Sequence, residues 1–182
     1  MTKRIAAALI AATLLFGCAL SEELSRKFTT KHFTLGLPVD WLISADGLEQ
    51  SEDSWELGYL YRSGDTLLCI ASQLDYYSDW ADVSLWRNDP DDMDEYVASL
   101  LKQLDEYGAS VMETVEVGRI PFVILECTMD GCLMYYAETM TNGYAVSFQL
   151  YAMDDDTYES RDVTREDYEL FVRILDSFEP II

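Results

Sequence analysis

Alternation of hydrophobic and polar residues marks several stretches of this chain as half-buried β-strands. In Phe33–Leu37 every second residue is apolar, and Pro38 ends the pattern. Further strands are predicted at residues 55–61, 66–74, 110–117, 121–129, 133–140 and 144–152. Asp130-Gly131 and Asn142-Gly143 are turn dipeptides typical of tight hairpins between consecutive strands. The pattern therefore predicts a mostly antiparallel, meander-like sheet.

Two segments carry apolar residues at helical spacing instead. The first follows Asp89-Pro90, has acidic residues in its first turn and stops at Gly108. The second opens with Thr164, three residues before Asp167, which is a capping-box spacing, and it ends at Pro180. Each helix has one apolar stripe, so each is expected to pack on the sheet.

The predicted strands at residues 121–129 and 133–140 are apolar on both faces, which indicates that both sides of the sheet are covered. The fold class predicted is therefore α+β: a mostly antiparallel meander sheet with two main helices packed on it. This is an α/β/α sandwich.

The first 31 residues differ in character from the rest of the chain. Lys3-Arg4 precedes twelve residues, 5–16, of which only Thr13 is polar. This is the pattern of a secretory signal and is too short for a stable transmembrane helix, which needs about 20 residues. The alternative, a buried N-terminal helix, has to explain the abrupt change of charge pattern at Ser21.

The segment Leu15-Phe16-Gly17-Cys18 resembles a bacterial lipobox, in which a small residue precedes the lipidated cysteine, although Phe16 departs from the usual smaller side chain. Ordinary signal-peptidase cleavage after Ala19 is the alternative. We predict a signal peptide at 1–17, a lipid anchor and tether at 18–31 with Cys18 lipidated, and a single α+β domain at 32–182. The protein is then exported across the cytoplasmic membrane and held at the cell surface or envelope by its N-terminal lipid.

The charge balance of the chain limits the classes of partner that it can bind. The chain has 34 acidic and 12 basic residues, a formal net charge of −22. Such a field repels phosphate backbones, which proteins bind mainly through Lys and Arg, so nucleic acid is excluded as a partner. A cationic ligand, a basic partner or plain solubility agrees better with this charge.

The order of elements over residues 33–179 resembles the PsbP-like α/β/α sandwich that secreted bacterial DcrB-like lipoproteins share. The matching residues are Phe33-Thr34-Leu35 with Leu37-Pro38-x-x-Trp41, the helix near Asp92, Gly118-Arg119-Ile120-Pro121, and Phe171-x-x-Ile174-Leu175-Asp176-Ser177-Phe178. The resemblance implies an exported accessory or adaptor domain rather than an enzyme. It carries over no functional residue, because the matching residues are core and turn positions and a shared fold does not establish a function.

Residues with catalytic or redox chemistry are few. His32 is the single histidine and lies where the tether meets the first strand, so it is a poor general base. Cys69 lies within an apolar run and is expected to be buried. Cys127 and Cys132 flank Asp130-Gly131. A four-residue loop would place these two thiols directly opposite for a disulfide, whereas a two-residue turn leaves them diagonal.

Metal and cofactor chemistry is not predicted. A zinc site lacks a convincing fourth ligand. The acidic clusters at residues 89–95 and 154–156 do not have the ligand spacing of an EF-hand. Helix capping explains the first cluster and a solvated loop explains the second. We therefore predict no bound metal and no cofactor.

The segment 76–86 places large aromatic residues among acids between a strand and a helix; they are Tyr76, Tyr77, Trp80 and Trp86. Exposed aromatics rimmed by charge are typical of recognition surfaces for proteins, glycans or cations. The alternative is a long loop whose rings complete the core. We therefore treat these four residues as a candidate site for an unknown protein or small ligand.

No set of residues favours catalysis over a structural role. The sequence thus indicates an extracytoplasmic, lipid-anchored, non-enzymatic binding or accessory module. A structural envelope or stress protein is the first alternative. A hydrolase working through two carboxylates is the second, and it requires a pocket with two facing acids, one of raised pKa.

Overall fold

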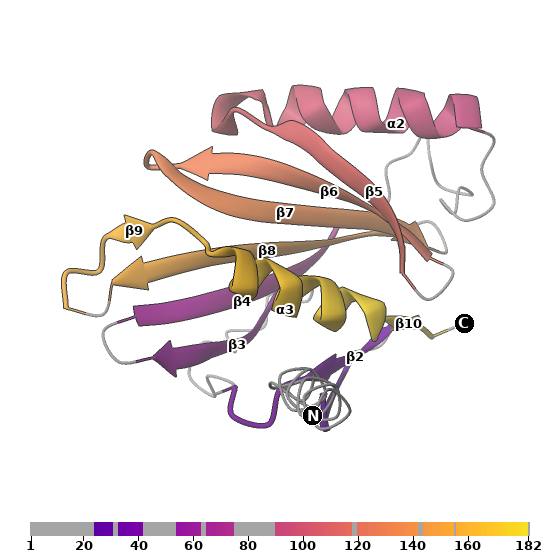
Figure 1. Ribbon diagram of the computed structural model, residues 1–182. Helices are drawn as coiled ribbons and strands as arrows, with labels where there is room; N and C mark the ends of the chain where they lie inside the picture. Colours follow the sequence, from indigo (N-terminus) through magenta and orange to yellow (C-terminus); the bar gives the residue numbers. More distant parts are fainter. Residues whose placement is uncertain are drawn as a thin grey trace, which may run out of the picture.

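A computed structural model describes the chain from residue 24 to residue 181, with internal gaps (Figure 1). The described residues are 24–30, 33–41, 54–62, 65–74, 90–117, 120–141, 144–154 and 156–181. The predicted signal peptide, Cys18, His32 and the aromatic segment 76–86 lie outside these ranges. No helix in the described ranges is long and apolar enough to cross a membrane.

In the described part of the chain, the main sheet has the strand order β3-β4-β8-β7-β6-β5, and a short strand, β9, also pairs with β8. All these strand pairs are antiparallel. Their bounds are β3 Ser54–Arg62, β4 Asp65–Leu74, β5 Ser110–Val117, β6 Ile120–Met129, β7 Cys132–Thr141, β8 Tyr144–Asp154 and β9 Ser160–Arg161. The predicted α+β class, with a mostly antiparallel sheet, is confirmed.

Strands β6 and β7 are joined by a two-residue turn. Asp130 and Gly131 have φ angles of 53° and 81°, so both lie in the left-handed region that this kind of tight hairpin needs. Glycine adopts that conformation without a steric penalty, and aspartate does so more readily than most residues. The turn fixes the register, in which Met129 opposes Cys132 and Cys127 opposes Met134.

The two α-helices of the described residues lie on opposite faces of this sheet (Figure 1). Helix α2 (Pro90–Gln103) continues into a 3₁₀ turn, η2 (Asp105–Tyr107), and Gly108 ends it with a φ of 59°. Helix α3 (Arg165–Asp176) begins with the predicted capping box, in which Thr164 and Asp167 bond each other's backbone N–H. It ends at Asp176, before the predicted stop at Pro180.

A separate three-stranded sheet joins the two ends of the described chain. It has the order β1-β2-β10, with β1 at Arg26–Thr29, β2 at Phe33–Leu37 and β10 at Glu179–Pro180. Strand β1 lies within the segment predicted as tether, so the folded part begins earlier than expected. Its sequence holds one apolar residue, Phe28, and pairing with β2 makes it a strand, because the residues themselves show no strand pattern.

Side chains from both faces of the main sheet are buried, as predicted. On one face, Phe122, Phe148 and Leu150 pack against α3 and β2 in the larger core. On the other face, Val123, Leu125, Cys127, Met134, Tyr136 and Met140 pack against Tyr96 and Leu100 of α2. Trp41, which follows β2, has no exposed surface and belongs to the larger core.

Candidate functional site

Two sets of candidate residues follow from the sequence, the aromatic residues of segment 76–86 and the hairpin cysteines. Tyr76, Tyr77, Trp80 and Trp86 lie outside the described residues, as does Cys18. The hairpin cysteines are both described.

Cys127 and Cys132 are free thiols. The two-residue turn leaves them diagonal, since Cys132 opposes Met129 and Cys127 opposes Met134. The Cys132 Sγ–H donates instead to the carbonyl of Ser160 on β9, at 3.1 Å. Cys69 is fully buried on the α3 face of β4, as expected, and burial raises the pKa of its thiol.

A buried acid lies beneath α2 on the middle of the sheet. Glu138 of β7 is 1% exposed and has Val123 of β6 and Ser147 of β8 as its cross-strand neighbours. Its Oε1 accepts a hydrogen bond from the Tyr96 hydroxyl of α2, and its Oε2 accepts one from the Tyr136 hydroxyl. This acid–phenol cluster (Glu138, Tyr96 and Tyr136) ties the helix to the sheet.

Burial decides the protonation of this cluster. Removal from water raises the pKa of Glu138 because the charged form loses its hydration. The two phenol hydrogen bonds favour the carboxylate and oppose this effect without cancelling it. Two donated hydrogen bonds satisfy both oxygens, so the group fits a structural role that holds α2 in place.

A cavity of about 90 Å³ lies beside this cluster, between the end of α2 and the sheet. Tyr136 belongs to both, because its ring also lines the cavity. The other lining residues are Leu104, Tyr107, Cys127, Met129, Met134 and Gln149. The volume equals that of about three water molecules at ~30 Å³ each. It is far below the ~300 Å³ at which pockets for organic ligands begin.

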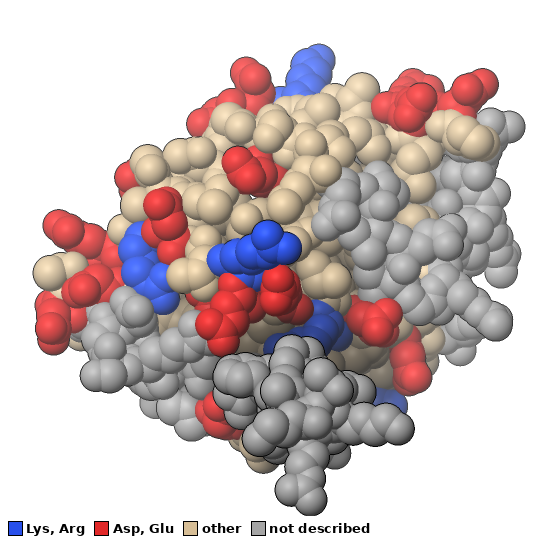
Figure 2. Space-filling view, viewed as in Figure 1, with Lys and Arg blue, Asp and Glu red and all other residues tan. Residues whose placement is uncertain are grey.

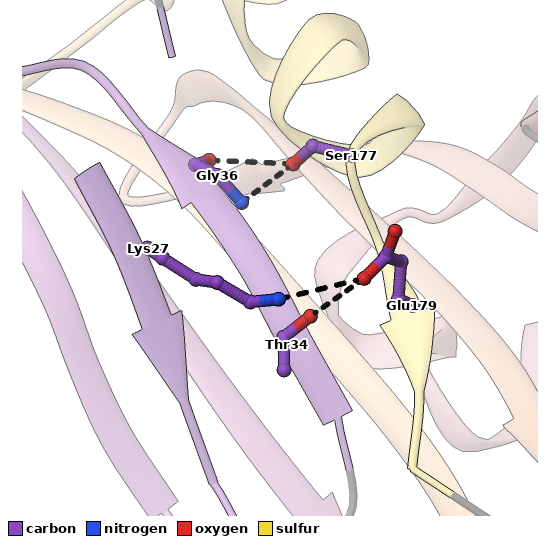
Figure 3. Close-up of polar contacts among 5 residues, drawn as sticks. All are labelled: Lys27, Thr34, Gly36, Ser177 and Glu179. Atoms are coloured by element: carbon purple, nitrogen blue, oxygen red, sulfur yellow. Dashed lines mark hydrogen bonds and ion pairs between the residues drawn. The ribbon is translucent and has the colours of Figure 1, made fainter. Parts of the chain in front are cut away.

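A second hollow, of about 200 Å³, lies along β1, β2 and the residues after α3. Figure 3 shows its polar contacts: Glu179 Oε2 meets Lys27 Nζ at 3.6 Å and accepts a hydrogen bond from the Thr34 hydroxyl. The Gly36 N–H donates to Ser177 Oγ at 2.7 Å. These contacts join β1 and β2 to the residues that follow α3.

The described parts of the acidic clusters form no ion site. Asp154 Oδ1 accepts hydrogen bonds from the N–H and hydroxyl of Thr157 and from the N–H of Asp156, which lowers the pKa of Asp154. It thus organises its own turn. Across the described ranges, no group of three or more His, Cys, Asp or Glu side chains is placed to hold a metal. Figure 2 shows acidic side chains spread over the face that carries α3, with basic ones among them.

Sequence reasoning missed Glu138 and the cavity. One signal was available: Glu138 is the single charged residue in the apolar run of β7. Its partner Tyr96 is 42 residues away on α2, so the pairing depends on tertiary packing. The cavity likewise depends on how α2 meets the sheet.

Comparison with known proteins adds no functional assignment. No protein-family model and no curated protein matches this chain.

Proposed function

We propose that the protein is an extracytoplasmic, lipid-anchored, non-enzymatic binding or accessory module. The observation that carries the anchoring is the N-terminal order: Lys3-Arg4, an apolar core, then Gly17-Cys18. Strand β1 begins only eight residues after Cys18. A diacylated cysteine carrying a further chain anchors firmly, since each buried methylene contributes about 0.8 kcal/mol.

A short tether restricts where the domain can go. Eight residues span at most about 27 Å when fully extended. The β1-β2-β10 sheet is therefore the part of the domain held nearest the bilayer. The hollow beside it contains the exposed Lys27–Glu179 pair, which has matched charges and suits a position near headgroups of either sign.

Size and charge support binding rather than catalysis. The two hollows described above are too small for a substrate of ordinary size. Among the described residues lining them, Glu179 is the one acid, whereas a carboxylate-dependent hydrolase uses two facing acids. The resemblance to PsbP-like and DcrB-like domains also supports an accessory, non-enzymatic role. The net charge of −22 favours a basic or cationic partner.

The anchor is tested by mass spectrometry of the native N-terminus together with membrane fractionation. We expect a chain that begins at Cys18 and carries the lipid mass, and a Cys18→Ala variant that is no longer retained on membranes. An unmodified chain beginning at Leu20, or a Cys18→Ala variant that stays membrane-bound, contradicts the anchor.

The partner surface is proposed at residues 76–86, because tryptophan and tyrosine give large contact areas at low entropic cost. In Trp80→Ala and Trp86→Ala we expect an unchanged melting temperature with weaker cross-linking to the native partner. Tyr158→Ala, at an exposed ring outside the segment, is the control. A large fall in melting temperature in the Trp80 or Trp86 variant would mean that these rings are core.

A further inference from the structure

Three sulfur-bearing side chains line the 90 Å³ cavity between α2 and the sheet: Cys127, Met129 and Met134. Cys127 and Met134 are direct cross-strand partners, and such partners have Cβ atoms about 4.5–5.5 Å apart. Met129 lies two residues after Cys127 on β6, hence on the same face. The tight hairpin thus brings one thiol and two thioethers to a single hollow.

This set of donors selects one class of ion. Thiolate and thioether sulfur are soft ligands that prefer Cu(I). Zinc sites use cysteine, histidine and carboxylate but not methionine, and calcium and magnesium need clusters of oxygen ligands. Neither acid nor histidine lines this cavity among the described residues. The donors present therefore favour a soft monovalent ion over a hard divalent one.

The size of the cavity agrees with an ion. A volume of about 90 Å³ is large enough for a metal ion but far below that of a pocket for an organic molecule. Cys127 and Met134 are 2% and 6% exposed, so both side chains are largely shielded from bulk solvent. Tyr107 also lines the cavity and is 38% exposed, so the cavity lies close to the surface.

We propose that Cys127, Met129 and Met134 form a three-sulfur site for Cu(I). On binding, the thiol proton passes to solvent, Cys127 Sγ bonds the ion, and the two thioethers each donate a lone pair, with no change of oxidation state. The site names a ligand for the proposed binding role and is independent of the lipid anchor. The acidic surface would raise the local concentration of cations. The alternative is that these sulfurs only fill the core.

The test is an anaerobic titration of the full chain with Cu(I) against a chromophoric Cu(I) chelator. Every sample carries Cys18→Ser, so that this thiol cannot contribute. We expect one ion per chain and an X-ray absorption spectrum with sulfur neighbours only. Met129→Leu and Met134→Leu should each weaken binding about tenfold or more, since even indirect ligand contacts change metal affinity by 10–100-fold.

Leucine conserves the volume of methionine, so these two variants should fold, which near-ultraviolet circular dichroism checks. Cys127→Ala should lose the ion. Cys132→Ser is the matched control, because its sulfur bonds Ser160 and does not line the cavity, and it should bind as the parent does.

Three outcomes overturn the site: no Cu(I) held against the chelator, a Cu(I) affinity in both Met→Leu variants equal to that of the parent, or a loss in Cys132→Ser as large as in Cys127→Ala. The result of the Cu(I) titration does not depend on the result of the mass spectrometry that tests the lipid anchor. A lipidated Cys18 in a chain that holds no Cu(I) leaves the anchor standing and refutes the metal site alone.

Discussion

Replacing Glu138 by glutamine should make the protein less sensitive to rising pH. The carboxyl is buried and its pKa is raised, so the folded state holds its proton more tightly than the unfolded state. Between the unfolded pKa, about 4.3, and the folded pKa, the folded state binds more protons, and the unfolding free energy falls as pH rises. The loss is about 1.4 kcal/mol for each unit by which the two values differ. Glu138→Gln removes this titration.

The stability difference expected at low pH follows from the hydrogen bonds that residue 138 makes with the two phenols. At pH 4 both side chains are neutral, and the amide can still accept from one phenol and donate to the other. The variant should therefore lie within about 1 kcal/mol of the parent there, the worth of one exchanged hydrogen bond. As pH rises, the variant should gain stability relative to the parent and then level off above the folded pKa.

Urea unfolding at a series of pH values from 4 to about 8 measures the unfolding free energies of variant and parent. Subtracting one from the other at each pH removes the contribution of the other acids. Glu126→Gln, the same substitution at an exposed position of β6, is the control. A flat difference for Glu138→Gln would refute the raised pKa. A variant that becomes less stable relative to the parent with rising pH would show that the carboxylate is the favoured form.

Two further predictions concern packing. Trp41→Ala should lower the unfolding free energy by about 3–5 kcal/mol, the range for deleting a large buried aromatic, and an unchanged urea midpoint would place the ring outside the core. Gly36→Ala should destabilise by about 1–3 kcal/mol, because a Cβ there would lie 3.1 Å from the Cβ atoms of Leu24 and Ser177. Adding Ser177→Gly should restore part of the loss in thermal unfolding, and strictly additive losses would contradict this crowding.

Local sequence determined the elements of the main sheet and its helices. Asp130-Gly131 favours a two-residue hairpin turn, and the spacing of Thr164 and Asp167 favours a capping box. Both features depend on a few neighbouring residues, so both could be predicted. Strand β1 could not, because its polar residues become a strand only when β2 offers hydrogen bonds. Strand β10 has two residues and needs the same partner.

The candidate site was less accessible to sequence reasoning. The hydrogen bond from Tyr96 to Glu138 joins helix α2 to strand β7, and no local sequence pattern predicts it. Cys127, Met129 and Met134 become neighbours only once the turn is known to hold two residues, because a longer loop would change which side chains oppose each other. The metal site therefore follows from the register of one hairpin.

The small β1-β2-β10 sheet has a consequence for the order of folding. Its contact between Thr34 and Glu179 closes a loop of 145 residues, whereas the β6–β7 hairpin closes a turn of two residues. Loop-closure entropy makes the long closure costlier by about 4 kcal/mol, so we expect the hairpin to form early and the small sheet last. A growing chain therefore keeps the β10 side of β2 unpaired until residue 180 arrives. Formation of the small sheet is thereby coupled to the arrival of Glu179 and Pro180.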